Sequence, residues 1–172
     1  MTRWIGPVLV AIGAAVLGWY GGLALSTYGV MEAAIRRISA EGGVNVMRHG
    51  TLPTAENQPI VRPSPDLAYS SCPYDLSKGP LLIKVTPAPG RYSSLSIFDA
   101  RTDVVFVRND QQAGGKAYQI ILARADQAVP KGTEVVRVDY DRGIALIRLL
   151  LRTPAEIGTL DPVRRQSSCQ TL

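Results

Sequence analysis

The pattern of hydrophobic and polar positions divides the chain into one uninterrupted apolar stretch and a longer region of short runs. No side chain from Trp4 to Met31 is charged, and residues 5–25 form a continuous apolar segment. A helix needs about 20 apolar residues to cross the hydrocarbon core of a bilayer. The pattern therefore predicts a single transmembrane helix within an N-terminal anchor, residues 1–31.

A cleaved signal peptide is the alternative interpretation of the same stretch. Arg3 supplies a positively charged start, and Ala24-Leu25-Ser26 has the small-x-small form that signal peptidase accepts. The apolar run is, however, longer than the roughly 7–15 residues of a typical signal-peptide core. The length therefore favours an anchor that stays in the membrane.

Small residues recur at every fourth position of the apolar segment, at Ala14, Gly18, Gly22 and Ser26. In lipid, helices associate through close backbone approach across such residues. Glycine is also frequent in membrane helices that make no such contact. We expect the ridge to pack against a helix of a partner membrane protein.

The residues after the span predict a short continuation and then a change of structure. Residues 32–40 continue a helical pattern, and Gly42-Gly43 is typical of a helix end. The following stretch is rich in proline, which favours extended chain. We therefore assign residues 32–60 to a membrane-proximal helix and a linker.

The remainder of the chain shows short strand-like runs separated by glycine and proline turns. The runs lie at residues 81–86, 92–98, 104–107, 118–122, 135–139 and 144–151. No helical pattern separates them, so a mainly β domain is predicted over residues 61–152, as an antiparallel β-sandwich or open barrel. Alternation along the second run places Leu95 and Ile97 on the core face.

The end of the chain predicts one short helix. Thr153-Pro154-Ala155-Glu156 has the spacing of a capping box, with proline at the first helical position. Residues 153–172 are therefore expected to form a C-terminal helix and a tail.

Charge and residue types exclude several functions. The formal net charge is +5, but the basic residues are scattered and form no stripe that would favour nucleic-acid binding. His49 is the one histidine, no Gly-x-Ser-x-Gly motif is present, and the two cysteines lie far apart. We therefore expect no catalytic residues of a familiar class, no metal site and no cofactor.

Topology and the cysteines point to the periplasmic side of the inner membrane. Arg36 and Arg37 follow the span, which by the positive-inside rule alone would favour a cytoplasmic domain, but long domains translocate largely regardless of charge. Cys72 and Cys169 suit an oxidising compartment if they form a disulfide. The alternative is two unpaired thiols.

Several motifs in order resemble a known family. They are Val61-Arg62-Pro63-Ser64-Pro65-Asp66-Leu67-Ala68-Tyr69-Ser70-Ser71, Asp75-Leu76-Ser77-Lys78-Gly79-Pro80, Gly90-Arg91-Tyr92-Ser93-Ser94-Leu95, and Phe98-Asp99-Ala100 with Thr102-Asp103. Together they resemble the bacterial family called domain of unknown function 1254, from Val61 to about Leu151. The sequence departs from the family pattern at Ser64, Cys72 and Asp103.

The resemblance implies a β-rich fold and a companion domain, of unknown function 1214, which larger members carry in the same chain. Because this chain ends where that domain would begin, we expect the companion on a separate partner membrane protein, and a non-catalytic envelope role through that partner. The alternative function is a domain that binds or processes a small molecule or glycan in a polar cleft. The candidate residues for that cleft, or for structural ion pairs, are Arg62, Asp66, Tyr69, Arg91 and Asp99.

Overall fold

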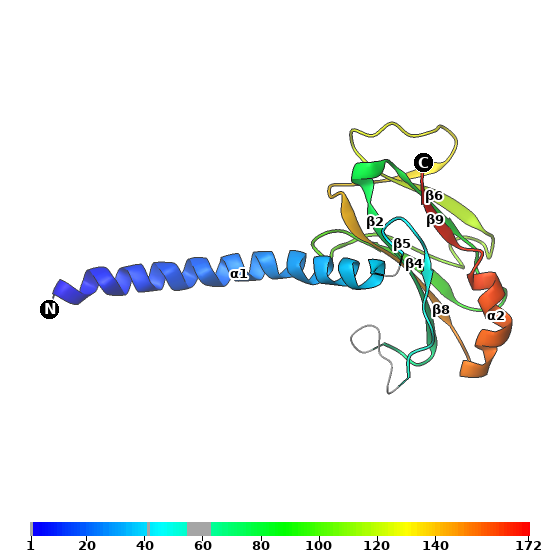
Figure 1. The fold of residues 1–172 in the computed structure, drawn as a ribbon, viewed down its shortest axis with the longest axis horizontal. Helices are drawn as coiled ribbons and strands as arrows, with labels where there is room; N and C mark the ends of the chain where they lie inside the picture. The colour runs from blue at the N-terminus through cyan, green and yellow to red at the C-terminus, as the bar shows by residue number, and fades with distance from the viewer. Residues whose placement is uncertain (1, 41, 55–62) are drawn as a thin grey trace.

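A long helix projects from a compact β-domain (Figure 1). The structure is a computed structural model that describes residues 2–40, 42–54 and 63–172. A single turn, η1 (Thr2–Trp4), leads directly into helix α1 (Ile5–Ser39). The N-terminus lies at the free end of α1, and the C-terminus lies on the β-domain.

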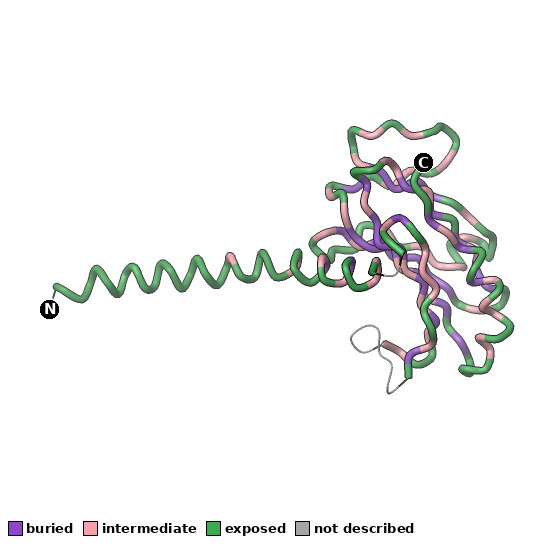
Figure 2. Tube along the Cα trace, in the orientation of Figure 1, coloured by how far each residue is buried: buried purple, intermediate pink, exposed green. Residues whose placement is uncertain are grey.

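Helix α1 is apolar and exposed over most of its length and meets the domain only at its end (Figure 2). Its length and composition are sufficient to cross a membrane. An N-terminal anchor and a signal sequence both have these properties. Its end is the predicted one, because the Gly43 amide donates a hydrogen bond of 2.8 Å to the Ser39 carbonyl. Gly43 adopts φ +79°, which a residue with a Cβ disfavours.

In the described residues, nine strands form two stacked sheets, so the predicted sandwich is confirmed. Sheet A has the order β1 (Arg48–His49), β2 (Leu67–Asp75), β8 (Arg142–Leu150), β4 (Ser93–Phe98), β5 (Val104–Asn109). Sheet B has the order β7 (Glu134–Val138), β6 (Tyr118–Arg124), β3 (Leu81–Val85), β9 (Ser168–Thr171). Every pair is antiparallel except β6 with β7, which run parallel.

Three short helical segments complete the described fold: η2 (Leu76–Lys78), η3 (Pro154–Glu156) and α2 (Ile157–Arg164). The last two confirm the predicted C-terminal helix, with Pro154 in its first turn. The capping box is wrong in detail, because the Thr153 side chain makes no cap hydrogen bond. The Glu156 carboxylate instead accepts a hydrogen bond from the Arg152 amide.

The main core lies between the two sheets. Leu95 and Ile97 are fully buried there, as the alternation of β4 predicts. A disulfide between Cys72 on β2 and Cys169 on β9 crosses this core and joins the sheets. A second cluster lies under α2, and a third buries Met31 and Ile35 of α1 against the domain.

Three strands lie where no strand is predicted. β2 contains Pro73, which cannot donate to a neighbouring strand and so argues against a strand from sequence. It is tolerated because β1 pairs only with Ser70 and Ser71, and the Pro73 carbonyl accepts from the Asn45 amide instead. β1 and β9 are short segments that gain their partners from distant parts of the chain.

Described segments outside the predicted β-domain, residues 61–152, also contribute to the fold. α1 runs through residue 31 without a break, and β1 belongs to sheet A. The C-terminal tail likewise belongs to the domain, because β9 pairs with β3.

Candidate functional site

The residues predicted to form a polar cleft do not lie together. Arg62 lies outside the described residues. Arg91 precedes β4 and Asp99 follows it, so the two stand at opposite ends of a strand. The structure therefore does not bring these two side chains together, and a ligand site among the predicted residues stays a prediction.

Each described member of that set instead has a local role. Arg91 forms a double hydrogen bond with Glu156, at 2.5 and 3.1 Å, and thereby ties the start of β4 to η3. The buried Asp99 carboxylate accepts from the Arg101 and Asp103 amides and so closes the turn before β5. The Tyr69 hydroxyl accepts from the Ser64 amide, and the Asp66 carbonyl accepts from the Leu151 amide. Arg91 thus forms an ion pair with Glu156, whereas the described contacts of Asp66 and Asp99 include no ion pair with Arg91.

His49 also has a local partner. Its Nδ1 lies 2.9 Å from the Ser70 hydroxyl, while burial, together with Arg164 and Arg165, lowers the pKa of His49. Cys72 forms a disulfide and therefore offers no thiolate to pair with it. Among the residues that the structure describes, no group of three or more His, Cys, Asp or Glu side chains is placed to hold a metal ion.

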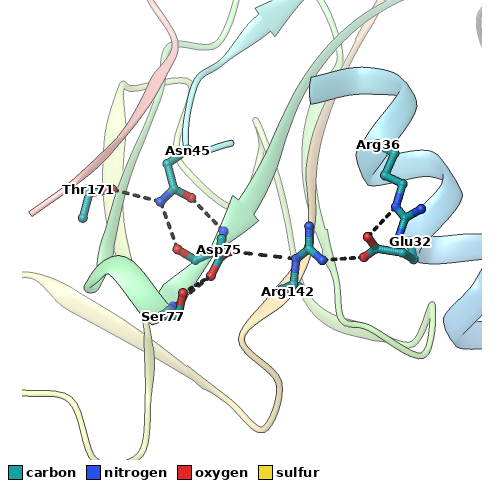
Figure 3. Close-up of polar contacts among 7 residues, drawn as sticks. All are labelled: Glu32, Arg36, Asn45, Asp75, Ser77, Arg142 and Thr171. Carbon is teal, nitrogen blue, oxygen red and sulfur yellow. Dashed lines mark hydrogen bonds and ion pairs between the residues drawn. The ribbon is translucent and has the colours of Figure 1, made fainter. Parts of the chain in front are cut away.

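The feature that stands out is the junction between helix α1 and sheet A (Figure 3). The Glu32 carboxylate accepts from Arg36 on the same helix at 2.9 Å and from Arg142 at the start of β8 at 2.7 Å. The Arg142 Nε in turn lies 4.0 Å from the Asp75 carboxylate at the end of β2. One arginine therefore links the helix to two adjacent strands.

A second set of hydrogen bonds extends this junction to the end of the chain (Figure 3). The Asn45 side chain donates to the Asp75 carbonyl at 3.0 Å and to the Thr171 hydroxyl on β9 at 2.9 Å. Its carbonyl oxygen accepts from the Asp75 amide at 2.8 Å. Asn45 has φ +63°, a conformation that asparagine tolerates better than most residues. The segment after α1 is thus fixed to both sheets.

Apolar contacts accompany the ion pairs. Met31 and Ile35, one helical turn apart, are buried against Ile144 and Phe98 of sheet A. Nearer the span, the Tyr28 and Tyr140 hydroxyls lie 3.1 Å apart, with their rings edge to face. A cavity of about 330 Å³ remains between the helix and the loops before β5 and β8.

The charges of the junction are those of a stable ion-pair network. The hydrogen bond from Arg36, assisted by the charge of Arg142, holds the pKa of Glu32 below its usual value. Burial raises the pKa of Asp75, but the hydrogen bonds from Ser77 and the charge of Arg142 outweigh it and leave that pKa lowered. Both carboxylates are therefore ionised at neutral pH, so the network fixes an orientation and offers no group poised to transfer a proton.

Sequence reasoning missed this junction. Glu32 and Arg142 lie 110 positions apart, and each is an ordinary charged residue beside a helix or turn. The weak signal was that Glu32 is the first charged residue after the apolar span. The residues of the predicted small-residue ridge, Ala14, Gly18, Gly22 and Ser26, are exposed, and nothing lies within 4 Å of a Cβ at either glycine; packing of the ridge against a partner helix stays a prediction.

Comparison with known proteins identifies the family of this chain and structures with a similar fold. The model of the family described as protein of unknown function (DUF1254) matches residues 44–171, which confirms the resemblance. The crystal structure of the VPA0106 protein from Vibrio parahaemolyticus is similar, with 18% identity, a TM-score of 0.67, and coverage of 88% of this chain and 36% of that chain. An uncharacterized protein from Burkholderia cenocepacia has 17% identity, a TM-score of 0.52, and coverage of 89% and 41%. No curated protein matches this sequence. The similarity to the two structures is one of fold, and the chain spans well under half the length of either.

Proposed function

The chain belongs to the DUF1254 family, and from this premise we propose that it is a single-pass protein of the bacterial inner membrane. Its β-domain lies on the periplasmic side, catalyses no reaction, and acts through a partner membrane protein. We further propose that this partner carries the companion domain of unknown function 1214.

The observation that carries the proposal is the unbroken path from the apolar helix into the junction. The 35 residues of α1 extend about 52 Å at about 1.5 Å per residue. The hydrocarbon core takes up about 30 Å of that length. The first contact with the domain, at Tyr28, comes three residues after the apolar segment. The domain is therefore held close to the membrane surface in a fixed orientation, which favours presentation of a surface to a neighbour in the same membrane.

The small-residue ridge is free to meet such a neighbour. Gly22 and Ser26 each lie nine positions before one of the two buried contact residues, Met31 and Ile35. Nine positions are about two and a half turns of an α-helix, so the ridge faces away from the side that packs on the domain. A second helix can approach there without displacing the junction.

The disulfide supports the periplasmic side. Disulfides persist in oxidising compartments and are rare in the cytosol. Arg36 and Arg37 do not oppose this orientation strongly, because a domain of more than 100 residues translocates largely regardless of nearby charge.

Purification of the intact chain in mild detergent tests the proposal. The wild-type protein should co-purify with a companion-domain protein, and Gly18→Leu with Gly22→Leu should weaken the association because leucine blocks close backbone approach. The matched control is Gly13→Leu with Gly21→Leu, which adds the same bulk about 100° around the helix. Equal recovery of the companion with both variants would contradict the ridge, and a wild-type chain that purifies alone would contradict the proposed function.

A further inference from the structure

The face of sheet A that points away from sheet B carries an apolar surface around one arginine. The core residues of β8 and β4 have odd numbers, so strand alternation places Leu146, Arg148 and Leu150, with Ser94 and Ser96, on the opposite face. The register sets Arg148 beside Ser94 and Tyr69. Helix α1 covers only one end of this face, through Ile144 and Phe98. We call the rest the Arg148 face, defined by Tyr92, Ser94, Ser96, Val107, Arg148 and Leu150.

Three side chains of the Arg148 face are apolar and exposed, whereas Ser94 and Ser96 between them are buried. Tyr92 is 45% exposed, Val107 53% and Leu150 42%. Leu150 lies on β8 and Val107 on β5, and Tyr92 directly precedes β4; the Leu150 amide donates to the Tyr92 carbonyl, and Val107 pairs with Ser96 of β4. Tyr92 and Leu150 therefore lie side by side at one end of this face and Val107 lies further along it, and exposed apolar side chains grouped on one face of a folded domain are typical of an interaction site.

Arg148 gives this surface its specificity. Its guanidinium donates to the Ser96 hydroxyl at 3.1 Å and lies 6.0 Å from the centre of the Phe98 ring. In the part of the chain that the structure describes, it forms an ion pair with no carboxylate. A half-buried guanidinium with free donors and no carboxylate partner among the described residues is complementary to one carboxylate.

We propose that the Arg148 face is the docking surface for the partner protein, and that the partner lays an apolar surface on it with an Asp or Glu side chain against Arg148. This inference rests on the proposed function. A protein fits better than a bilayer, because membrane surfaces recruit through clusters of Lys and Arg, whereas Arg148 is the one basic residue among those that define the face. The face also ends at β5, which is an edge strand of sheet A. The outer edge of β5 pairs with no other described strand and can accept a strand of the partner.

Site-specific photocrosslinking of the full chain in its native membrane tests this docking surface. The probes are Val107→p-benzoylphenylalanine and Leu150→p-benzoylphenylalanine, and the control is the same residue at Lys84, which is exposed on the outer side of sheet B. The two probes should crosslink to one membrane protein, the control should not, and the crosslinked peptide should lie beside an Asp or Glu. That protein should also be the one that co-purifies with the wild-type chain.

Charge reversal then tests the role of Arg148. Arg148→Glu should weaken the association at least about thirtyfold, as loss of a desolvated charge pair does, and Arg148→Gln should weaken it in the same direction without adding a charge. Lys84→Glu should leave it unchanged. Replacing the mapped partner carboxylate by arginine should restore binding to Arg148→Glu, an effect that a merely unfolded variant cannot show.

The outcomes separate this inference from the proposed function. Crosslinks only to lipid or to a second copy of the chain, an association unchanged by Arg148→Glu, or failure of the charge swap would overturn the docking surface while a co-purified partner still stands. A wild-type chain that neither crosslinks nor co-purifies with another protein would overturn both.

Discussion

Removal of the disulfide should lower the stability of the domain by several kcal/mol. Cys72 and Cys169 are buried in the core and are separated by 97 positions along the chain. In the chain-entropy model, closing a loop of this length in the unfolded state stabilises the fold by about 4.7 kcal/mol. A domain of ordinary size is stable by about 5–15 kcal/mol. The bridge therefore supplies about a third or more of the stability.

The measured loss should be smaller than this upper value, because of where Cys169 lies. β9 is the edge strand of sheet B and is held, apart from the disulfide, by four register positions on β3. Without the bridge β9 can detach while the remaining strands stay folded. We therefore expect a loss of about 2–4 kcal/mol, together with faster hydrogen exchange in β9 and β3.

The assay is a urea titration of the intact protein in mild detergent, followed by circular dichroism. It compares the oxidised wild-type protein, the same protein after reduction, and the double variant Cys72→Ala with Cys169→Ala. The oxidised protein should have the highest midpoint, and the other two should have similar lower midpoints. Equal midpoints for all three, or two reactive thiols after denaturation without reductant, would refute this reasoning.

Two further predictions concern packing and the junction. Gly143→Ala should destabilise the domain by about 3 kcal/mol in thermal unfolding, because its Cβ would lie 2.1 Å from the Phe98 carbonyl and 2.4 Å from the Tyr74 hydroxyl. The control is Gly158→Ala in α2, where nothing lies within 4 Å of the added Cβ, and it should leave the domain equally or more stable. Equal losses of stability in the two variants would contradict the packing argument. The Glu32–Arg142 pair should contribute about 0.5–1 kcal/mol in a double-mutant cycle. Because the folded-state pKa of Glu32 is lowered, that contribution should be present above the unfolded pKa of about 4.3 and lost as pH falls through the folded pKa. Hydrogen exchange in the last turns of α1 that does not change with acidification would contradict this pH dependence.

Strands bounded by turn residues could be predicted from the sequence. β3, β4 and β6 each follow a glycine or proline turn, and β8 carries a long apolar pattern, which local propensity alone can identify. β2 was missed because Pro73 argues against a strand and is tolerated only through the position of Asn45. β1 and β9 are too short to show a pattern and exist because a distant strand offers them a partner.

The candidate site was harder to predict than the fold for a related reason. The junction depends on Glu32 meeting Arg142, and the Arg148 face depends on four strands taking one register. Nothing in the local sequence around either arginine distinguishes it from a solvated charge. The pairing of Cys72 with Cys169 could be proposed from their number, but only the approach of β2 and β9 brings their Cα atoms within 6.6 Å.

The most direct test of the central claim is the intact mass of the chain from the membrane fraction, after spheroplasts are treated with a membrane-impermeant amine reagent. All four lysines are exposed on the β-domain: Lys78, Lys84, Lys116 and Lys131. We predict a membrane-bound chain that keeps its N-terminal helix and carries labels on these lysines. A full-length chain with no label on these lysines would place the domain in the cytoplasm, and a labelled chain that begins near Thr27 would show that the helix is a cleaved signal; either result would contradict the account.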